Sequence, residues 1–392
     1  MSGLRLDEST TLPLDGCAGA LAGRVWRPDL GGPSVVVARA DGVFDLSGDF
    51  PTIRDLCEAV DAAGALRGAR GERVASLAEI LANTPPDRRD STRPWLLAPI
   101  DLQAIKAAGV TFAASMLERV IEERARGDMG AAASIRAEMV GLIGDDLAKL
   151  KPGSPAAMRL KEALIAQGAW SQYLEVGIGP DAEIFTKSQP MAAVGHGFDA
   201  GFHHGSAWNN PEPEVVLAVN SAGAIVGAAL GNDVNLRDVE GRSALLLGKA
   251  KDQNASCAIG PFLRLFDATF SLDDVRGLDV ALNVEGEDGF RLEGGSSIRR
   301  ISRDPADLVA QMIGASHQYP DGAVLFLGTM FAPIADRDAP GKGFTHKVGD
   351  VVTVRADKLG QLTNRMRHSR DCPPWAYGAS HLMRHLARRG LI

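Results

Sequence analysis

The sequence predicts an α+β protein whose helical and extended segments are largely separated along the chain. Residues 22–46 contain short apolar runs broken by Pro and Gly, which is typical of strands. Residues 113–150 are rich in Ala, Glu, Arg and Met, which favour helix. From residue 170 onward, apolar β-branched runs alternate with turn residues and indicate a mainly β region. The 392 residues are enough for a sizeable core and for two domains.

The first 93 residues are predicted to form a smaller N-terminal α/β domain, and residues 94–392 a catalytic domain. Apolar periodicity gives three strands followed by two helices, at residues 22–26, 34–38, 43–46, 51–65 and 72–83. The polar segment 84–94 contains Pro85 and Pro86 and is interpreted as a linker. Residues 1–93 hold no cluster of acid, base and metal ligands, so an accessory role at the entrance or in a subunit contact is expected.

The first part of the second domain is predicted to be helical. Gly127, Gly130 and Gly141 interrupt the segment 113–150, so two or three helices are expected there, with another at 155–168. Most of the charged residues of this segment are interpreted as a solvated face. A basic helical tail over 376–391 is expected to dock on the body or on a neighbouring subunit.

The rest of the second domain is predicted to be mainly extended. A helix is expected at 305–318. The expected strands are 214–219, 224–230, 256–262, 278–285, 290–295, 322–328 and 351–355.

Composition narrows the possible partners and the compartment. A net charge of −7 and a pI near 5.7 argue against a nucleic-acid partner. No basic segment followed by an apolar stretch opens the chain, and no apolar run is long enough to span a bilayer. The four cysteines are isolated and lack Cys-x-x-Cys spacing, which indicates reduced thiols in a cytoplasmic protein.

Three carboxylates are predicted to converge at the end of a β-hairpin. Glu212 and Glu214 lie two residues apart in an extended segment, so they point to the same face. A turn at 220–223 then brings Asp233 back to the level of Glu212. Such a cluster needs either protons or a cation, and its all-oxygen donor set favours Mg²⁺, Mn²⁺ or Ca²⁺. The residues alone also leave open a solvated strand end with incidental acids.

Charged residues on either side of the hairpin are further candidates. Arg237 and Asp238 are predicted to form a buried ion pair that holds the metal loop. Of the two lysines in the segment 248–254, one could bind a carboxylate or an enolate oxygen. Glu183 and Lys187 lie on a predicted strand and are acid–base candidates, although a surface strand of alternating charge would look the same.

A hydroxyl and several histidines complete the candidates. Thr329 follows Gly328 at the end of an apolar run, where the hydroxyl and the Gly amide could hold a carboxylate. His196, His203 and His204 lie in a Gly-rich segment shortly before the acids. Such loop histidines more often have no role in a site.

The order and spacing of these motifs resemble the fumarylacetoacetate hydrolase superfamily over roughly residues 95–370. The resemblance implies a mixed β-roll or sandwich core, a homodimer or homotetramer, and Mg²⁺ or Mn²⁺ held by the three acids. It places the family lysine on Lys251, rather than on Lys249, and the family threonine on Thr329. The matching motifs are Phe185-x-Lys187, Glu212-x-Glu214, Gly231-Asn232-Asp233-Val234-x-x-Arg237-Asp238, Gly248-Lys249-x-Lys251, Gly260-Pro261 and Gly328-Thr329.

One departure from the family pattern bears on the reaction. Hydrolytic members carry a water-activating His shortly after a Gly-Val-Asn-Tyr-like segment, and here that position falls on Ser115. The segment Pro180-x-x-Glu183-x-Phe185-x-Lys187 instead resembles the sugar-acid dehydratase branch. This branch implies dehydration of a 2-keto-3-deoxy-D-pentonate (xylonate or arabinonate) to 2,5-dioxopentanoate in pentose catabolism.

The resemblance also implies a role for each candidate residue. Glu183 would act as base, as acid or as both, Lys251 would stabilise an enolate or the substrate carboxylate, and Thr329 would bind that carboxylate. The further expected contacts to the 2-keto acid are Phe185, Lys187, Arg237 and Asp238. Two alternatives stay open. One is an acylpyruvate or fumarylacetoacetate-type C–C hydrolase in which a loop histidine replaces the missing base, and the other is a non-catalytic, metal-stabilised binding protein.

Overall fold

The structure is a computed structural model built around two β-sheets. It describes residues 4–331 except 127, 129, 132–149, 167 and 169, together with 333, 335–340 and 343–392. The larger sheet has eleven strands in the order β4-β3-β2-β1-β13-β11-β10-β16-β6-β7, with β5 paired to β1. Its strands are β1 (Ala20–Arg27), β2 (Gly32–Arg39), β3 (Gly42–Asp45), β4 (Glu72–Ala75), β5 (Trp95–Leu97), β6 (Ala104–Gly109), β7 (Glu183–Ser188), β10 (Pro213–Val219), β11 (Ile225–Asp233), β13 (Cys257–Leu265) and β16 (Ala323–Phe326).

The second sheet has five strands in the order β15-β14-β17-β18-β8. These are β8 (Asp199–Phe202), β14 (Asp279–Glu285), β15 (Arg291–Ser297), β17 (Val351–Ala356) and β18 (Gly360–His368). Buried residues alternate with exposed ones along β14, and its buried face packs with β10 and β11 in one apolar core. A two-stranded pair joins β9 (Asn209–Asn210) and β12 (Asn235–Leu236). The predicted α+β fold with a mixed β-roll or sandwich core is confirmed.

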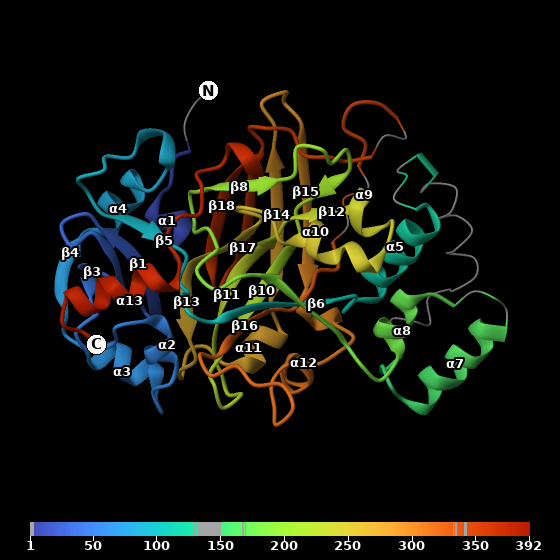
Figure 1. The fold of residues 1–392 in the computed structure, drawn as a ribbon, viewed down its shortest axis with the longest axis horizontal. Helices are drawn as coiled ribbons and strands as arrows, with labels where there is room; N and C mark the ends of the chain where they lie inside the picture. The colour runs from blue at the N-terminus through green and yellow to red at the C-terminus, as the bar shows by residue number, and fades with distance from the viewer. Residues whose placement is uncertain are drawn as a thin grey trace.

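Helices lie mainly at the two ends of this arrangement (Figure 1). The N-terminal strands and α13 lie at one end, α5, α7 and α8 lie at the other, and the sheets occupy the middle. The α-helices are α1 (Glu8–Thr11), α2 (Ile53–Cys57), α3 (Ala62–Gly68), α4 (Leu77–Asn83), α5 (Ala113–Arg124), α7 (Pro155–Ala166), α8 (Gln172–Ile178), α9 (Arg237–Glu240), α10 (Leu247–Lys251), α11 (Leu272–Arg276), α12 (Pro305–Met312) and α13 (Ala379–Arg388).

Several predicted elements differ from those in the structure. Helix α4 starts only at Leu77, because Ser76 caps it in a capping box with Glu79, and residues 72–75 form β4 instead. The helix expected at 51–65 is two short helices, since the side chain of Asp61 caps a second start. Helix α8 and strands β8 and β18 were not predicted. The later part of the helical segment 113–150 falls on residues 132–149, outside the described residues.

The two predicted domains share one sheet. Strand β1 pairs antiparallel with β13, for example Ala20 with Leu265, and β5 pairs with β1 on the other side of the proposed linker. Apolar side chains of both parts, such as Val35 and Ile259, are buried in the same cluster. Strand pairing therefore joins the two parts into one continuous sheet. The division at residue 93 stays a prediction about how function is distributed between them.

The C-terminal helix is docked on the body, which is one of the two places that the sequence analysis expected for it. Helix α13 packs against β2 and buries Leu382 and Leu386. His385 Nε2 lies 3.1 Å from the carbonyl oxygen of Pro33, and Arg389 donates to Ser34 Oγ at 3.1 Å. The tail is thereby fixed to the N-terminal strands.

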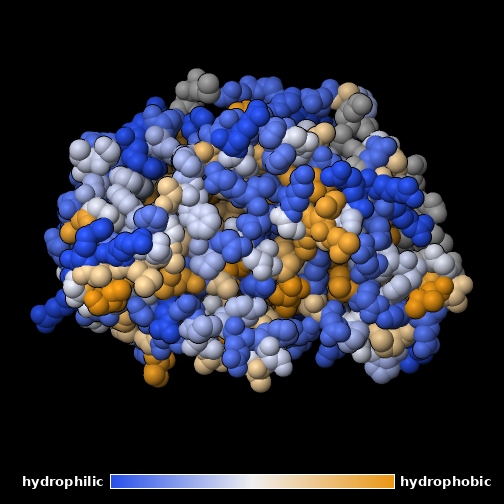
Figure 2. Space-filling view, in the orientation of Figure 1, coloured by the Kyte–Doolittle hydropathy of each residue, from blue (hydrophilic) through white to orange (hydrophobic). Residues whose placement is uncertain are grey.

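The visible surface is mainly hydrophilic, with hydrophobic side chains gathered near α9 and α10 (Figure 2). Leu245, just before α10, is almost fully exposed. Within the described residues, no helix combines the length and the apolar character that crossing a membrane requires.

Candidate active site

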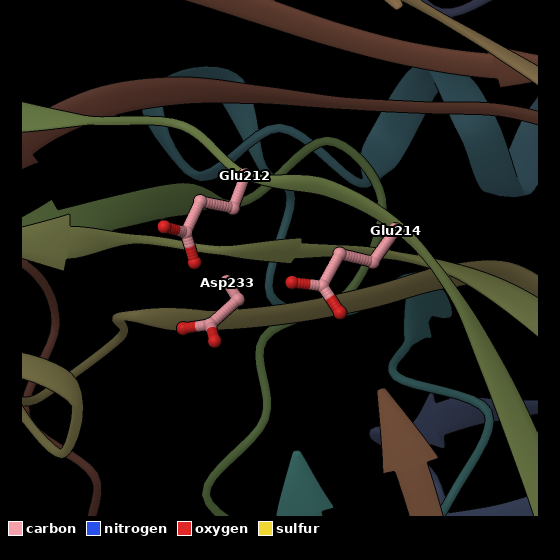
Figure 3. A group of neighbouring side chains, drawn as sticks. All are labelled: Glu212, Glu214 and Asp233. Atoms are coloured by element: carbon pink, nitrogen blue, oxygen red, sulfur yellow. The ribbon is translucent and has the colours of Figure 1, made fainter. Parts of the chain in front are cut away.

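The three predicted acids meet at the end of the β10–β11 hairpin (Figure 3). Glu212 and Asp233 lie opposite each other, and the Asp233 amide donates to the Glu212 carbonyl oxygen at 3.0 Å. Glu214 is two residues further along the same strand and points to the same side. One carboxylate oxygen from each acid lies within 4.8 Å of the others, and all three side chains are buried. Strand pairing therefore produces the cluster, as predicted.

Two of the three acids contact cationic side chains. Lys251 Nζ lies 2.5 Å from Glu212 Oε2 and 3.0 Å from Asp233 Oδ2. Lys187 Nζ lies 2.9 Å from Asp233 Oδ1, and Arg119 Nη2 lies 2.6 Å from Glu212 Oε1. Each of these carboxylates is thus held between two cations, which also fixes its orientation.

Glu214 differs from its two neighbours. Its Oε2 accepts a hydrogen bond from the Gly328 amide at 2.6 Å, and no ion pair to a described cation accompanies it. Burial, followed by the charges of Asp233 and Glu212, raises the pKa of Glu214 well above its ordinary value. A cation among the three acids would remove this repulsion. The donor set therefore suits a hard divalent ion such as Mg²⁺.

A second layer of charges connects the cluster to helix α5. Arg119 lies 2.6 Å from Glu122 and 2.8 Å from Glu240, in addition to its contact with Glu212. Arg237 Nε lies 2.7 Å from the other oxygen of Glu122. The helix is thereby tied both to the metal cluster and to α9.

These α5 residues do not belong to the solvated face that the sequence indicated for most charged residues of the segment. Glu122 is buried, and Glu118 lies 3.2 Å from Arg237 Nη2. The one available signal was the i, i+4 spacing of Glu118 and Glu122, which places both on one side of a helix together with Arg119.

The predicted ion pair between Arg237 and Asp238 is also wrong. Arg237 is buried against the ring of Trp208, with the guanidinium 4.3 Å from its centroid, and pairs with α5. Asp238 instead accepts hydrogen bonds from Ser206 Oγ at 2.7 Å and from the Ala207 amide at 2.9 Å. The two side chains leave α9 in different directions because consecutive helical residues do not face each other.

The acids line an open cavity with an excess of negative charge. Seven carboxylates line it, against three cationic side chains. Adding Lys187 behind Asp233 leaves three uncompensated negative charges when all acids are ionised. The acids are Glu118, Glu122, Glu183, Glu212, Glu214, Asp233 and Glu240, and the lining cations are Arg119, Arg237 and Lys251.

Glu183 enters this cavity from the start of β7. It is paired with Gly109 of β6, and a Cβ at Gly109 would lie 2.1 Å from Glu183 Oε2, so the close approach needs glycine. Burial and then the charge of Glu240 raise the pKa of Glu183 to about 7. Phe185 lines the same cavity, with Lys251 Nζ 5.7 Å from its ring centroid. A carboxyl that exchanges its proton near neutral pH thus faces the acid cluster.

The remaining predicted contacts divide into two groups. Thr329 lines the cavity, and its Oγ1 accepts the Phe331 amide at 3.1 Å. The Gly328 amide is already bonded to Glu214, so it does not form the carboxylate contact that the sequence suggested. Lys187 and Asp238 do not line the cavity and instead support Asp233 and the loop before β9.

No histidine is among the residues lining the part of this cavity that the structure describes. Ser115 lines it and donates to the Phe112 carbonyl oxygen at 2.9 Å. His196 is buried between Thr11 and the Thr363 amide, and the rings of His203 and His204 stack on each other with centroids 4.5 Å apart. None of the three histidines replaces the base that is missing at Ser115.

Comparisons with known proteins agree with the motifs. Residues 209–367 match the family described as fumarylacetoacetate (FAA) hydrolase C-terminal. The chain is 30% identical over 188 residues to a 2-dehydro-3-deoxy-D-arabinonate dehydratase of Saccharolobus solfataricus. It is 28% identical over 192 residues to a probable 2-keto-3-deoxyxylonate dehydratase of Haloferax volcanii. These matches span 48% and 49% of this chain, and 59% and 62% of the two relatives.

Solved structures share the fold. An apo 2-keto-3-deoxy-D-arabinonate dehydratase aligns with a TM-score of 0.61 at 20% identity, over 89% of this chain and 99% of the other. A structure of 2-keto-3-deoxy-D-arabinonate dehydratase described as complexed with magnesium and 2,5-dioxopentanoate gives the same TM-score, identity and coverage. At this identity the likeness establishes the architecture.

Proposed function

We propose, from the match of residues 209–367 to the fumarylacetoacetate hydrolase C-terminal family together with the geometry of the site, that the protein is a metal-dependent hydro-lyase acting on 2-keto-3-deoxy sugar acids. The substrate is a 2-keto-3-deoxy-D-pentonate, of the xylonate or arabinonate series, and the product is 2,5-dioxopentanoate. The single observation that carries the proposal is the cavity in which Glu183, with a pKa near 7, faces three metal-ligating carboxylates and no described histidine. The names of both relatives support this choice of substrate.

The acids Glu212, Glu214 and Asp233 would hold Mg²⁺ or Mn²⁺. Such an ion supplies Lewis-acid polarisation of the 2-keto group, which acidifies the protons on carbon 3. Lys251 and Lys187 contact Glu212 and Asp233 and hold their carboxylates in the orientation for this task. Glu214 would be the third ligand, and a bound cation would relieve the repulsion by Asp233 and Glu212 that raises its pKa.

Glu183 performs the proton transfers. Its carboxylate takes a proton from carbon 3, and the carboxylic acid so formed returns it to the hydroxyl that leaves carbon 4 as water. The alkene between carbons 3 and 4 then loses a proton from carbon 5 and gains one at carbon 3. The enol so formed moves its hydroxyl proton to carbon 4, which gives the aldehyde. A pKa near 7 keeps both protonation states populated at neutral pH, which suits a group that acts as base and then as acid.

Other lining residues bind and orient the substrate. Thr329 and Lys251 are the contacts for its carboxylate and keto oxygens, and Phe185 forms an apolar wall. Arg237, Lys187 and Asp238 act indirectly, because they hold α5, Asp233 and the loop before β9 in place.

The two alternative functions have less support. C–C hydrolysis needs a base that directs water to a second carbonyl, and Ser115 is hydrogen-bonded to its own helix turn. A non-catalytic binding protein would have no use for a carboxyl with a pKa near 7 beside the metal acids. A homodimer or homotetramer and a cytoplasmic location remain part of the proposal.

Product analysis tests this function directly. The Mg²⁺-loaded protein is incubated with 2-keto-3-deoxy-D-xylonate and with 2-keto-3-deoxy-D-arabinonate, and products are followed by NMR. We expect 2,5-dioxopentanoate from at least one of them, and none from the Asp233→Asn variant. Release of pyruvate from an acylpyruvate at a rate equal to or above that of dehydration would establish the hydrolase instead.

A further inference from the structure

A second cavity differs in composition from the cavity that the acid cluster lines, and the two cavities share no lining residues. It is bounded by β1, by the segment 191–195 after β7, and by residues 373–377, which we call the C-terminal strap. Its volume is about 200 Å³. Aromatic side chains form much of its wall, namely Trp26, Phe198, Trp375 and Tyr377.

One buried cation, Arg24, lines this cavity, and not all of its hydrogen-bond donors have a strong acceptor. Its side chain comes from β1 and the residue is 6% exposed. Nη1 donates to the Ile100 carbonyl oxygen, but the acceptor near Nη2 is the thioether sulfur of Met191 at 4.0 Å, which is a weak acceptor. Nε lies 3.9 Å from Asp101. Burial lowers the pKa of Arg24, which indicates that its charge is incompletely compensated.

Asp101 does not complete the coordination of Arg24, because other donors already occupy its oxygens. Oδ2 accepts the Ile53 amide at 2.6 Å, and Oδ1 accepts the Arg54 amide at 3.1 Å and the Leu102 amide at 2.8 Å. These bonds cap the start of α2. The guanidinium of Arg24 therefore has only a long ion pair with Asp101, at 3.9 Å from Nε, and no carboxylate oxygen within hydrogen-bond distance among the described residues.

A second polar group in the wall is also unpartnered. The hydroxyl of Tyr377, on the C-terminal strap, is buried and has no hydrogen-bond partner among the described residues. Its ring packs edge-on to Trp26, with centroids 5.3 Å apart. The charge of Arg24 opposes the rise that burial causes in the pKa of Tyr377, so the two groups interact through space. Two donors thus converge on one apolar chamber.

The carboxylate that lines the chamber, Asp199, is not the acceptor for these two donors. Asp199 pairs with Arg365 at 2.8 Å and with Arg367 at 3.2 Å, so it is already neutralised. Two non-glycine residues with positive φ, Met191 at 71° and Ala255 at 62°, also line the chamber. Such strained backbone is concentrated at binding sites, where the surrounding structure holds it.

We propose that this chamber binds a small aromatic monocarboxylate. Its carboxylate accepts hydrogen bonds from the Arg24 guanidinium and the Tyr377 hydroxyl, and its ring lies among Trp26, Phe198 and Trp375. The planar guanidinium matches a carboxylate, and a charged pair is strengthened in an apolar surrounding. A cavity of about 150 Å³ is known to hold a benzene ring, so about 200 Å³ leaves room for one ring with its carboxylate. The site does not depend on the proposed reaction.

The experiment compares benzoate with its neutral analogue benzamide. Each is titrated into the full-length, Mg²⁺-loaded protein by calorimetry, and tryptophan fluorescence is recorded, since Trp26 and Trp375 line the chamber. We expect saturable 1:1 binding of benzoate, at least about tenfold tighter than that of benzamide, because the neutral amide lacks the charge-assisted bonds.

Variants assign the binding to this chamber. Arg24→Gln and Tyr377→Phe should each weaken benzoate about tenfold or more, and Arg24→Lys should weaken it less because it keeps the charge. Asp233→Asn is the matched control for the metal cavity and should leave benzoate affinity unchanged. Should Arg24→Gln fail to fold in a thermal melt, Tyr377→Phe decides, because its ring keeps the packing against Trp26.

Three results would overturn the proposal. The first is the absence of saturable benzoate binding up to about 20 mM, which lies well above the roughly millimolar affinity of a small ligand held by one charged pair. The second is equal affinity for benzoate and benzamide. The third is benzoate binding that Asp233→Asn removes while Tyr377→Phe leaves it intact.

Discussion

Glu212 and Asp233 face each other across the first pair of residues at the open end of the β10–β11 hairpin, joined by a backbone hydrogen bond of 3.0 Å. Their carboxylates share Lys251, which lies 2.5 Å from one and 3.0 Å from the other. Metal ligands on a paired main chain are held more rigidly than ligands on a loop. The geometry of the proposed metal site is therefore set by the strand register.

The acid cluster should be required for activity but not for folding. Glu212→Gln, Glu214→Gln and Asp233→Asn should each abolish dehydration and Mg²⁺ binding measured by calorimetry. The exposed β15 residue Glu293, replaced by Gln, is the matched control and should behave as wild type. EDTA should inactivate the protein and Mg²⁺ or Mn²⁺ should restore it. Full activity in a verified metal-free preparation would falsify this role.

Glu183 should control the pH dependence of turnover. Because the base must be ionised and its pKa is raised to about 7, kcat should increase as pH rises through about 7. Glu183→Gln should lower kcat about 10²–10⁴-fold, with little change in Mg²⁺ affinity. Deuterium from D₂O should appear at carbon 3 of the product. If the variant kept the wild-type pH profile, another group would have to be the base.

Arg119 should act as a structural bridge between α5 and the acids. Arg119→Gln leaves Glu212, Glu122 and Glu240 with less positive charge, and loss of one partner from such a buried network typically costs about 3–5 kcal/mol of stability. Urea unfolding measures this loss, and Mg²⁺ should recover part of it by compensating the acids. The control is Arg291→Gln, whose side chain is 80% exposed and which should change stability by less than about 0.5 kcal/mol.

His196 should make the fold sensitive to acid. The Thr363 amide donates to Nδ1 at 3.0 Å, so Nε2 carries the proton of the neutral ring and faces Thr11 Oγ1 at 3.1 Å. Burial lowers the pKa of His196 to about 3, below the unfolded value of 6.5. The unfolded state therefore binds an extra proton between those values, and stability is lost as pH falls below about 6.5.

The size of this effect can be isolated with a variant. One proton changes the free energy of unfolding by at most about 1.4 kcal/mol per pH unit. Between pH 6.5 and 5, the slope of the unfolding free energy against pH, measured with urea, should be correspondingly smaller for His196→Gln than for wild type. Equal slopes in the two proteins would show that His196 does not titrate in this way.

The parts of the site that local geometry determines could be predicted from sequence. A short turn between two apolar strands brings their far ends to the same level, so the meeting of Glu212 and Asp233 could be predicted from the hairpin. A strand that contains Glu183 could also be predicted from local pattern, over residues 180–187, although β7 begins only at Glu183. Both features depend on residues close together in the chain.

Features set by long-range packing were missed. Arg119 lies 93 residues from Glu212 in sequence, and only the docking of α5 over the cavity turns its charge inward. Strands β8 and β18 pair in parallel although more than 160 residues separate them, as the contact of Asp199 with Arg365 shows. Neither segment has a run of apolar residues long enough to reveal a strand on its own.

The pairing of β1 with β13 has a consequence for any shortened form of the chain. Strand β13 is buried along its whole length and also pairs with β11, which carries Asp233. On its other side, the last three residues of β13, Leu263–Leu265, pair with Ala20–Ala22 of β1. Without the first strands, that end of β13 would lose its partner, and unpaired strand edges recruit strands from other molecules. We therefore expect a chain shortened past β1 to aggregate more readily, unless a charged residue or a proline is placed at that end.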